Sequence, residues 1–207
     1  MPAHMPSRRI GIMGGSFDPI HIAHLIMAES VLEALSLDLV LFVPSGSQPL
    51  KRDKYVSPIE HRVAMVELAI AGNPHFALSR VDVDRPGPSY TVDTVPALRQ
   101  EWSGPEVEMW FIVGADSLST FPRWRDPSGI LAHVRLAVVR RPGVEPDMLL
   151  LKAALPQLEE RLDWVDAPLI DISATDIRRR VAAGLSIRYR VPDAVRDYIE
   201  ANCLYKL

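Results

Sequence analysis

Short, unbroken apolar runs alternate with helix-patterned stretches along most of this chain, and this alternation limits the fold more than any other feature. The runs "RIGIM" (residues 9–13), "LVLFVP" (39–44) and "MWFIVG" (109–114) have the length of strands and are bounded by turn residues. Such runs are typical of strands that are covered on both faces, as in a parallel sheet. Between the first two runs, apolar residues recur at the spacing of one helix face, at Leu25, Ala28, Val31, Leu32 and Leu35. Alternating strands and helices predict an α/β fold with a parallel sheet.

The same patterns extend the prediction to the rest of the chain. Further strands are expected within residues 76–83, 134–143 and 168–172, and helices after Pro58 and within residues 91–102, 147–160, 174–183 and 192–202. Pro96 is expected to start or kink the second of these helices. We therefore predict a Rossmann-like parallel sheet flanked by helices, with a small helical C-terminal part over residues 172–207. Residues 8–207 are expected to form one domain, and residues 1–7 to be disordered or foreign to the natural chain.

Composition and charge exclude several classes of function. The formal net charge of −3 argues against extensive binding to nucleic acid, which requires a strongly basic surface. No apolar run reaches the roughly 18 residues of a membrane helix, and "MPAHMPSRR" lacks the apolar region of a secretory signal. A cytoplasmic location with no membrane partner is therefore expected. The single cysteine, Cys203, excludes an internal disulfide, and the oligomeric state is left open.

The stretch "GGSFDPIHIAH" (residues 14–24) follows the first predicted strand and has the chemistry of an anion site. Gly14 and Gly15 allow the backbone to approach a phosphate, and the following helix would direct free N–H groups toward it. His21 and His24 lie three positions apart, so on a helix both imidazoles can reach one phosphate. The stretch matches neither the P-loop nor the dinucleotide fingerprint, and a zinc site lacks a third ligand nearby. Alternatively, the histidines only occupy a helix surface, and Asp18 only caps the helix or ties the turn.

Two further polar stretches also follow predicted strands, where ligands of parallel α/β proteins bind. In "ISATDIR" (residues 172–178), Ser173 is a good helix cap, Asp176 completes a weak capping box, and Arg178 adds a cation next to the helix N-terminus. In "GADS" (residues 114–117), the Asp116 carboxylate suits the two hydroxyls of a ribose, or serves as a simple cap.

Taken together, these stretches resemble the nucleotidyltransferase superfamily that carries the histidine-any-glycine-histidine motif. The first stretch departs from that signature at Ala23, which replaces the usual glycine. The late stretch is similar to the superfamily's "ISSTxIR" string, with Ala174 in place of one serine. The segments "PSYTVDT" (88–94) and "FIVGADSLSTFPRW" (111–124), together with "VPSGSQPLK" and "RRPG", closely resemble the bacterial nicotinate-nucleotide adenylyltransferases. This resemblance covers the chain from Ile10 to about Tyr205.

The resemblance implies a reaction and a set of residues. The reaction is transfer of AMP from ATP to nicotinate mononucleotide, which yields nicotinate adenine dinucleotide and pyrophosphate in NAD biosynthesis. The catalytic residues would be His21, His24, Lys51 and Arg178. ATP would contact Gly14, Gly15, Ser16, Phe17, Gly114, Asp116, Ser173 and Thr175. Nicotinate mononucleotide would contact Ser16, Lys51, Tyr90, Thr91, Trp124 and Arg141. Mg²⁺ is expected to accompany ATP, with no metal held by the protein itself.

Some alternatives stay open at this level. Trp124 offers a flat face for a pyridine ring, although tryptophans usually pack in cores. Arg141 either reaches the acceptor phosphate or remains a surface charge. Phosphopantetheine adenylyltransferases and cytidylyltransferases share the first and last motifs, and a nucleotide-binding module without turnover is the alternative from another class. The sequence leaves open the choice between nicotinate and nicotinamide mononucleotide, and the effects of Ala23 and Ala174.

Overall fold

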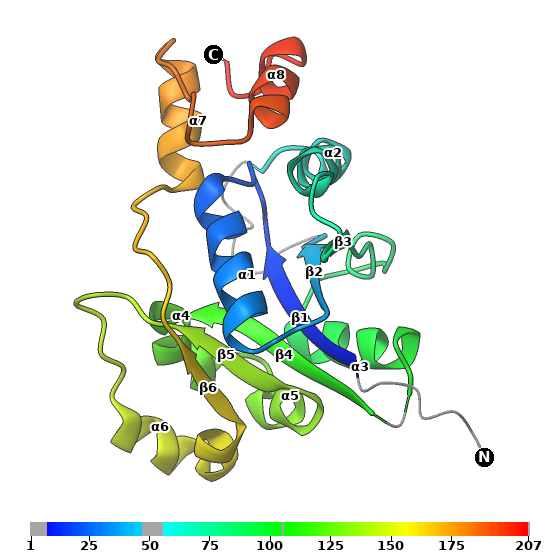
Figure 1. Ribbon diagram of the computed structural model, residues 1–207, viewed down its shortest axis with the longest axis vertical. Helices are drawn as coiled ribbons and strands as arrows, with labels where there is room; N and C mark the ends of the chain where they lie inside the picture. The colour runs from blue at the N-terminus through cyan, green and yellow to red at the C-terminus, as the bar shows by residue number, and fades with distance from the viewer. Residues whose placement is uncertain (1–7, 47–55, 105, 207) are drawn as a thin grey trace.

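Six parallel strands form the centre of the protein (Figure 1). The structure, a computed structural model, describes residues 8–46, 56–104 and 106–206. The predictions for residues 1–7 and for Lys51 fall outside these ranges. The sheet has the order β3-β2-β1-β4-β5-β6, and every neighbouring pair is parallel. The strands are β1 (Arg8–Gly15), β2 (Leu39–Pro44), β3 (Phe76–Leu78), β4 (Val107–Gly114), β5 (Arg135–Val139) and β6 (Leu162–Val165). The predicted Rossmann-like parallel sheet is confirmed.

Both faces of the sheet are covered, and side chains alternate between them along each strand. On β2, Val40 and Phe42 belong to one buried cluster, whereas Leu41 and Val43 belong to the other. This alternation follows from the period of two in an extended backbone. Because each of these side chains is withdrawn from water, the strand is apolar at every position, and its sequence gives an unbroken run.

Helices divide between the two faces of the sheet (Figure 1). The cluster on one face includes side chains from α1 (Ile22–Ala34), α2 (Ile59–Ile70), α7 (Ala174–Ala182) and α8 (Asp193–Ala201). The cluster on the other face includes side chains from α3 (Thr91–Glu101), α4 (Ala115–Thr120), α5 (Pro127–His133) and α6 (Met148–Ala154). Short 3-10 turns, η2 (Phe121–Arg123) and η3 (Pro156–Arg161), follow α4 and α6. The predicted helical C-terminal part is present as α7 and α8.

Three of the predicted strands differ from the observed ones. The strands predicted within residues 76–83 and 134–143 shorten to β3 and β5, and residues 168–172 are not a strand. The last strand is instead β6, which contains Asp163. This charged residue hides the strand in the sequence, and the structure stabilises it through hydrogen bonds donated by Trp110 Nε1 (2.8 Å) and Arg135 Nε (2.6 Å). The segment that was predicted as a strand, residues 168–172, lies outside the sheet. Its Leu169 is 57% exposed.

Two helices also differ from the prediction at prolines. The helix predicted within residues 147–160 ends at Ala154, because Pro156 has no N–H to donate and begins the 3-10 turn. Helix α3, in contrast, starts at Thr91 and runs through Pro96. Helices α4 and α5 were not predicted, since they span only 6 and 7 residues.

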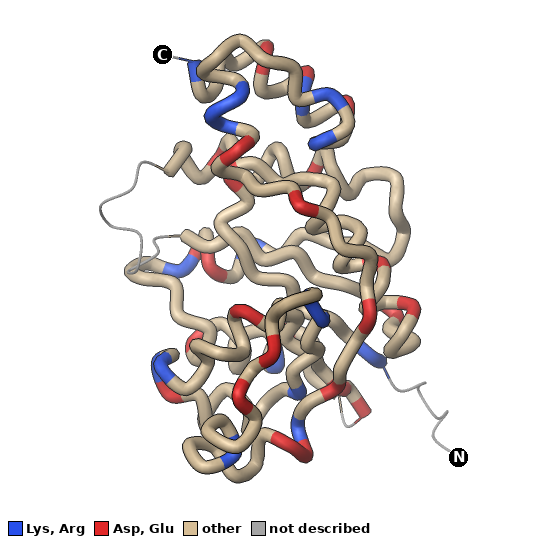
Figure 2. The backbone as a smooth tube through the Cα atoms, turned by 90° about the vertical axis from the view of Figure 1, so that its left-hand side faces the viewer, with Lys and Arg blue, Asp and Glu red and all other residues tan. Residues whose placement is uncertain are grey.

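Basic residues of the C-terminal helices lie beside acidic ones (Figure 2). Arg196 pairs with Asp193 (2.5 Å) and Asp197 (2.6 Å), and Arg179 pairs with Asp176. Their charges are therefore locally offset. Within the described ranges, no helix combines the length and apolar character needed to cross a membrane.

Candidate active site

A cavity of about 270 Å³ opens where β1 and β4 end. Carboxyl ends of neighbouring parallel strands meet at one edge of a sheet, and ligands of such folds bind there. The cavity brings together residues that are far apart in the sequence. Six of them were predicted for the site: Gly14, Gly15, His24, Thr91, Gly114 and Trp124.

The two histidines stack at the start of α1. His21 is the N-cap residue, and its ring lies 3.7 Å from the ring of His24, measured between centroids. The backbone N–H of His21 donates a hydrogen bond to His24 Nδ1 (3.2 Å). Because Nδ1 of His24 accepts, the proton of the neutral ring is on Nε2, and that N–H is available to a ligand in the cavity that His24 lines.

Both imidazoles are uncharged at neutral pH. Burial lowers the pKa of His21 from 6.5 to about 4. Burial, followed by the proximity of His21, lowers the pKa of His24 well below its ordinary value. Burial therefore favours the neutral form of both rings. Across residues 8–46, 56–104 and 106–206, no group of three or more His, Cys, Asp or Glu side chains is arranged to hold a metal ion.

The start of α1 differs from the predicted anion site in one respect. The N–H of Ile22 donates to the carbonyl of Arg190 (3.0 Å), and the N–H of His24 donates to the carbonyl of His21 (2.9 Å). These two helix donors are therefore satisfied within the protein. The expectation of free N–H groups at this helix end is wrong for both, because the C-terminal part supplies the acceptor for Ile22 and the first turn itself supplies the acceptor for His24.

Asp18 ties the first motif to distant parts of the chain. It is buried, and its carboxyl oxygens accept hydrogen bonds from the Ser57 N–H (3.1 Å) and the Tyr205 hydroxyl (2.7 Å). Its backbone carbonyl accepts a hydrogen bond from Arg178 Nη1 (2.6 Å). Asp18 thus links its turn to distant segments, and it does not cap α1, since the N-cap position is occupied by His21. The first and last motifs, 160 residues apart at this contact, are thus joined directly.

The last motif starts helix α7 as predicted. The Ser173 hydroxyl accepts a hydrogen bond from the Asp176 N–H (3.1 Å) and caps the helix. The Asp176 carboxylate pairs with Arg179 and Arg190. Arg178 Nη2 lies 3.4 Å from the hydroxyl of Thr175. Arg178 is therefore held between the two motifs, with one guanidinium nitrogen bonded to Asp18 and the other close to Thr175.

Arg62 is a buried residue of this region that was not predicted. Its guanidinium donates to the carbonyls of Ser16 (2.7 Å), Gly46 (3.2 Å) and Ser57 (3.1 Å), and only 3% of the residue is exposed. These bonds join the turn after β1 to the residues that follow β2 and to the segment before α2. A signal exists in the sequence, since Arg62 occupies the apolar face of α2, beside Val63.

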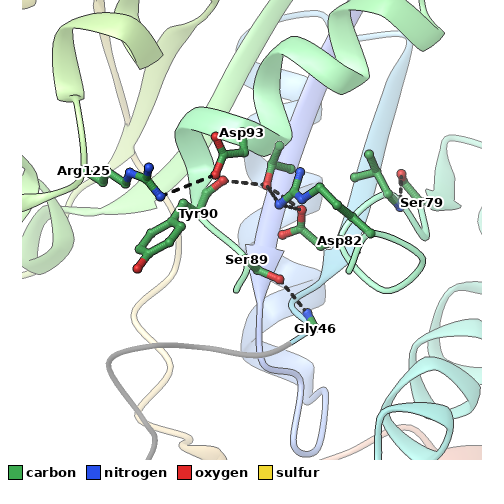
Figure 3. A network of polar contacts seen from close by, with 10 residues as sticks. Gly46, Ser79, Asp82, Ser89, Tyr90, Asp93 and Arg125 are labelled. Carbon is green, nitrogen blue, oxygen red and sulfur yellow. Dashed lines mark hydrogen bonds and ion pairs between the residues drawn. The ribbon is translucent and has the colours of Figure 1, made fainter. Parts of the chain in front are cut away.

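Tyr90, Thr91 and Trp124 were predicted to contact the acceptor, and the first two lie where α3 begins. Tyr90 is the N-cap residue of α3 and Thr91 its first residue, which lines the cavity. The Arg125 guanidinium lies 4.6 Å from the centre of the Tyr90 ring (Figure 3). Trp124 packs edge-on against Phe121 (5.3 Å between ring centres) and also lines the cavity. It thus packs in the core and still contributes to the cavity wall.

Asp82 is a second residue that was not predicted. Its carboxylate is buried, lines the cavity, and accepts hydrogen bonds from Thr94 Oγ1 (2.6 Å) and Arg85 Nη2 (2.8 Å) (Figure 3). Burial raises the pKa of Asp82, and the hydrogen bond from Thr94 and the charge of Arg85 oppose that rise. No local pattern distinguishes this residue, since its segment was predicted to be a strand.

The other predicted residues that the structure describes are not among those that line the cavity. Phe17 is buried and its ring contacts that of His24 (5.1 Å between centres). Asp116 and Arg141 are exposed and face each other, with Oδ2 and Nη1 3.9 Å apart. Ser16, whose carbonyl accepts from Arg62, follows β1 directly. Lys51 lies outside the described residues.

A parallel sheet with stacked histidines at the end of its first strand defines the class of protein. The chain belongs to the cytidylyltransferase-like family, whose sequence model matches residues 12–180. Within that family it belongs with the nicotinate-nucleotide adenylyltransferases, as its relatives indicate. A protein of Thermomicrobium roseum, named a probable nicotinate-nucleotide adenylyltransferase, is 50% identical over 198 residues, which cover 96% of this chain and 92% of the relative. A Roseiflexus sp. RS-1 protein of the same name is 51% identical over 202 residues, which cover 98% and 100%.

Solved structures share the fold at much lower identity. The Plasmodium falciparum nicotinic acid mononucleotide adenylyltransferase complexed with NaAD superposes with a TM-score of 0.77 and 18% identity, over 96% of this chain and 97% of that chain. The same enzyme complexed with APC gives a TM-score of 0.76. The family resemblance seen in the sequence is confirmed.

Proposed function

We propose that the protein joins ATP and nicotinate mononucleotide in the cavity at the carboxyl ends of β1 and β4, forming nicotinate adenine dinucleotide and pyrophosphate for NAD biosynthesis. The observation that carries this proposal is that one cavity brings His24 and the glycine turn together with Thr91 and Trp124. The first pair suits a phosphate, and the second pair suits a pyridine ring with an anionic substituent.

The chemistry requires no covalent enzyme intermediate. A phosphate oxygen of nicotinate mononucleotide attacks the α-phosphorus of ATP, and the bond from that phosphorus to the oxygen bridging to the β-phosphate breaks. The electron pair leaves with pyrophosphate. Because the attacking phosphate is already anionic, the protein needs to supply positioning and charge stabilisation, and no general base.

His24 supplies a donor for the charge that develops on the transferring phosphate. Its Nδ1 is occupied by the N–H of His21, so Nε2–H is directed to the ligand with a fixed tautomer. His21 buttresses the ring by stacking at 3.7 Å. A preorganised donor of this kind does not have to reorient during the reaction.

The remaining polyphosphate binds where the first and last motifs meet. Gly14 and Gly15 line the cavity, and Arg178, Ser173 and Thr175 provide the cation and hydroxyls of the last motif. Lys51 is a further predicted phosphate contact. Mg²⁺ would arrive with ATP, coordinated by its phosphates and water.

The acceptor binds at the start of α3. The N-terminal end of that helix suits the carboxylate of nicotinate, and Trp124 provides the wall for its ring. The ribose of ATP is assigned to Gly114 and Asp116 at the end of β4, and the acceptor phosphate to Ser16 and Arg141.

Pyrophosphate release with a panel of substrates tests the proposal. ATP and CTP would each be combined with nicotinate mononucleotide, nicotinamide mononucleotide and phosphopantetheine. The highest kcat/KM is expected for ATP with nicotinate mononucleotide. Turnover only with phosphopantetheine or only with CTP would assign the protein to a sister activity, and nucleotide binding without pyrophosphate release would make it a binding module.

A further inference from the structure

Asp82 is a buried acid in the cavity that the proposed chemistry leaves without a role. It lies in the connection between β3 and α3, is 6% exposed, and lines the same cavity as Thr91 and Trp124. A carboxylate in this place carries a cost, because the acceptor is itself an anion. A buried acid retained next to an anionic ligand therefore calls for a function of its own.

The Asp82 carboxylate contacts residues on both sides of Tyr90 and Thr91, which are called the acceptor segment below. On one side, Thr94 Oγ1 donates to Asp82 Oδ1 at 2.6 Å, and Thr94 is in the first turn of α3. On the other side, the Ser89 hydroxyl lies close enough to Asp82 to help lower the pKa of its carboxyl against the effect of burial. Tyr90 and Thr91 lie between Ser89 and Thr94 along the chain. Their backbone cannot shift relative to Asp82 without disturbing one of these contacts.

Ser89 also connects the acceptor segment to the end of β2. Ser89 Oγ accepts a hydrogen bond from the N–H of Gly46 (2.9 Å), two residues beyond β2. A Cβ atom on Gly46 would lie 2.5 Å from the carbonyl oxygen of Asp82, so the two backbones are in direct contact. The acceptor segment is thereby placed at a fixed distance from the sheet.

Arg85 makes the buried charge compatible with an anionic ligand. Its Nη2 donates to Asp82 Oδ1 at 2.8 Å, and the side chains of both residues are largely withdrawn from water, with 25% and 8% exposed. The pair presents little net charge to the cavity. The carboxylate can then accept its hydrogen bonds without repelling the acceptor.

We propose that Asp82 is a positioning residue for the acceptor, which holds the Tyr90–Thr91 segment through Thr94 and Ser89 in the geometry that binds nicotinate mononucleotide. This inference rests on the proposed function, in which that segment contacts the acceptor and not ATP. It assigns to Asp82 an effect on one substrate only.

Steady-state kinetics of Thr94→Val and Asp82→Asn test the assignment. Valine has the shape of threonine and removes the donor, so the KM for nicotinate mononucleotide is expected to rise about tenfold, the effect of losing one hydrogen bond to a charged group. The KM for ATP is expected to stay within about twofold of wild type. Thr94→Ser retains the hydroxyl and should restore the KM. Asp84→Asn is the matched control, because Asp84 is an exposed acid of the same turn that pairs with Arg80.

Calorimetric titration with nicotinate mononucleotide in the absence of ATP gives a second readout. Its Kd should weaken in Thr94→Val and Asp82→Asn by the same factor as the KM. An equal rise in both KM values, unchanged values in a folded variant, or a Thr94→Ser variant no better than Thr94→Val would overturn the inference. If Thr94→Val fails to fold, Asp82→Asn and Thr94→Ser decide it. A wild-type protein that binds nicotinate mononucleotide without turnover would refute the proposed function alone, and the Kd values would still decide this inference.

Discussion

Replacing His24 by asparagine separates the two roles that the structure gives to its ring nitrogens. Asparagine places an oxygen near the position of Nδ1, so it can still accept the hydrogen bond from the N–H of His21. It has no group that reaches the position of Nε2. His24→Asn therefore removes the donor to the transferring phosphate and leaves the start of α1 in place.

The expected loss in rate follows from which interaction is made only in the transition state. Removing one preorganised donor to a developing oxyanion lowers kcat by about 10²–10³, or about 3–4 kcal/mol. The 3.2 Å bond to Nδ1 is made in the ground state and contributes about 1 kcal/mol to folding. His24→Ala removes both interactions. It should lose kcat to the same extent as His24→Asn and melt lower by about 2–4 °C.

Pyrophosphate release and thermal melts of both variants provide the measurement. His133→Asn is the control, because His133 is exposed at the end of α5 and should retain wild-type kinetics. A His24→Asn rate within about threefold of wild type would refute the reasoning. So would a fall in melting temperature as large as that of His24→Ala, since the lost rate would then come from a displaced loop.

Three other expectations follow from buried contacts. Between pH 6.5 and about 4, the free energy of unfolding should fall by about 3 kcal/mol. The reason is that burial lowers the pKa of His21 in the folded protein to about 4, so the unfolded chain binds the proton at a higher pH than the folded one. Melts of His21→Asn should show a smaller fall over this range, and an equal fall would contradict the expectation. Arg178→Lys should lower kcat/KM for ATP about tenfold, since lysine lacks the forked donors; unchanged kinetics would argue against the assigned phosphate contact. Gly46→Ala should destabilise the protein by about 1–3 kcal/mol through contact with the Asp82 carbonyl, as measured by denaturant unfolding. Gly72→Ala, where a Cβ would meet nothing within 4 Å, is its control and should melt like wild type.

Patterns that depend on neighbouring residues could be predicted from the sequence. The runs at β1, β2 and β4 indicated buried parallel strands because every side chain of such a strand leaves water. Ser173 was predicted as a cap from its position before a helix, and it caps α7. Strand β6 escaped prediction because Asp163 interrupts its apolar pattern, and the partners that stabilise this acid come from β4 and β5.

Residues whose roles depend on distant partners could not be predicted in the same way. Asp82 and Arg62 have no local signature of a site. Their roles depend on contacts with segments that are distant in the sequence. Asp82 accepts a hydrogen bond from Thr94, and Arg62 donates one to the carbonyl of Ser16. Likewise, no pattern linked Tyr205 to the first motif, although its hydroxyl donates to the carboxyl of Asp18.

The sequence by itself determined that this chain forms a parallel α/β sheet with histidines after the first strand, because periodicity and motif spacing are local properties. The tertiary structure alone decided which nitrogen of His24 accepts a hydrogen bond from the backbone, how Arg178 meets the first motif, and that Asp82 lines the cavity. Burial and hydrogen bonding between segments set charges and tautomers, and these depend on distances that only the folded chain defines.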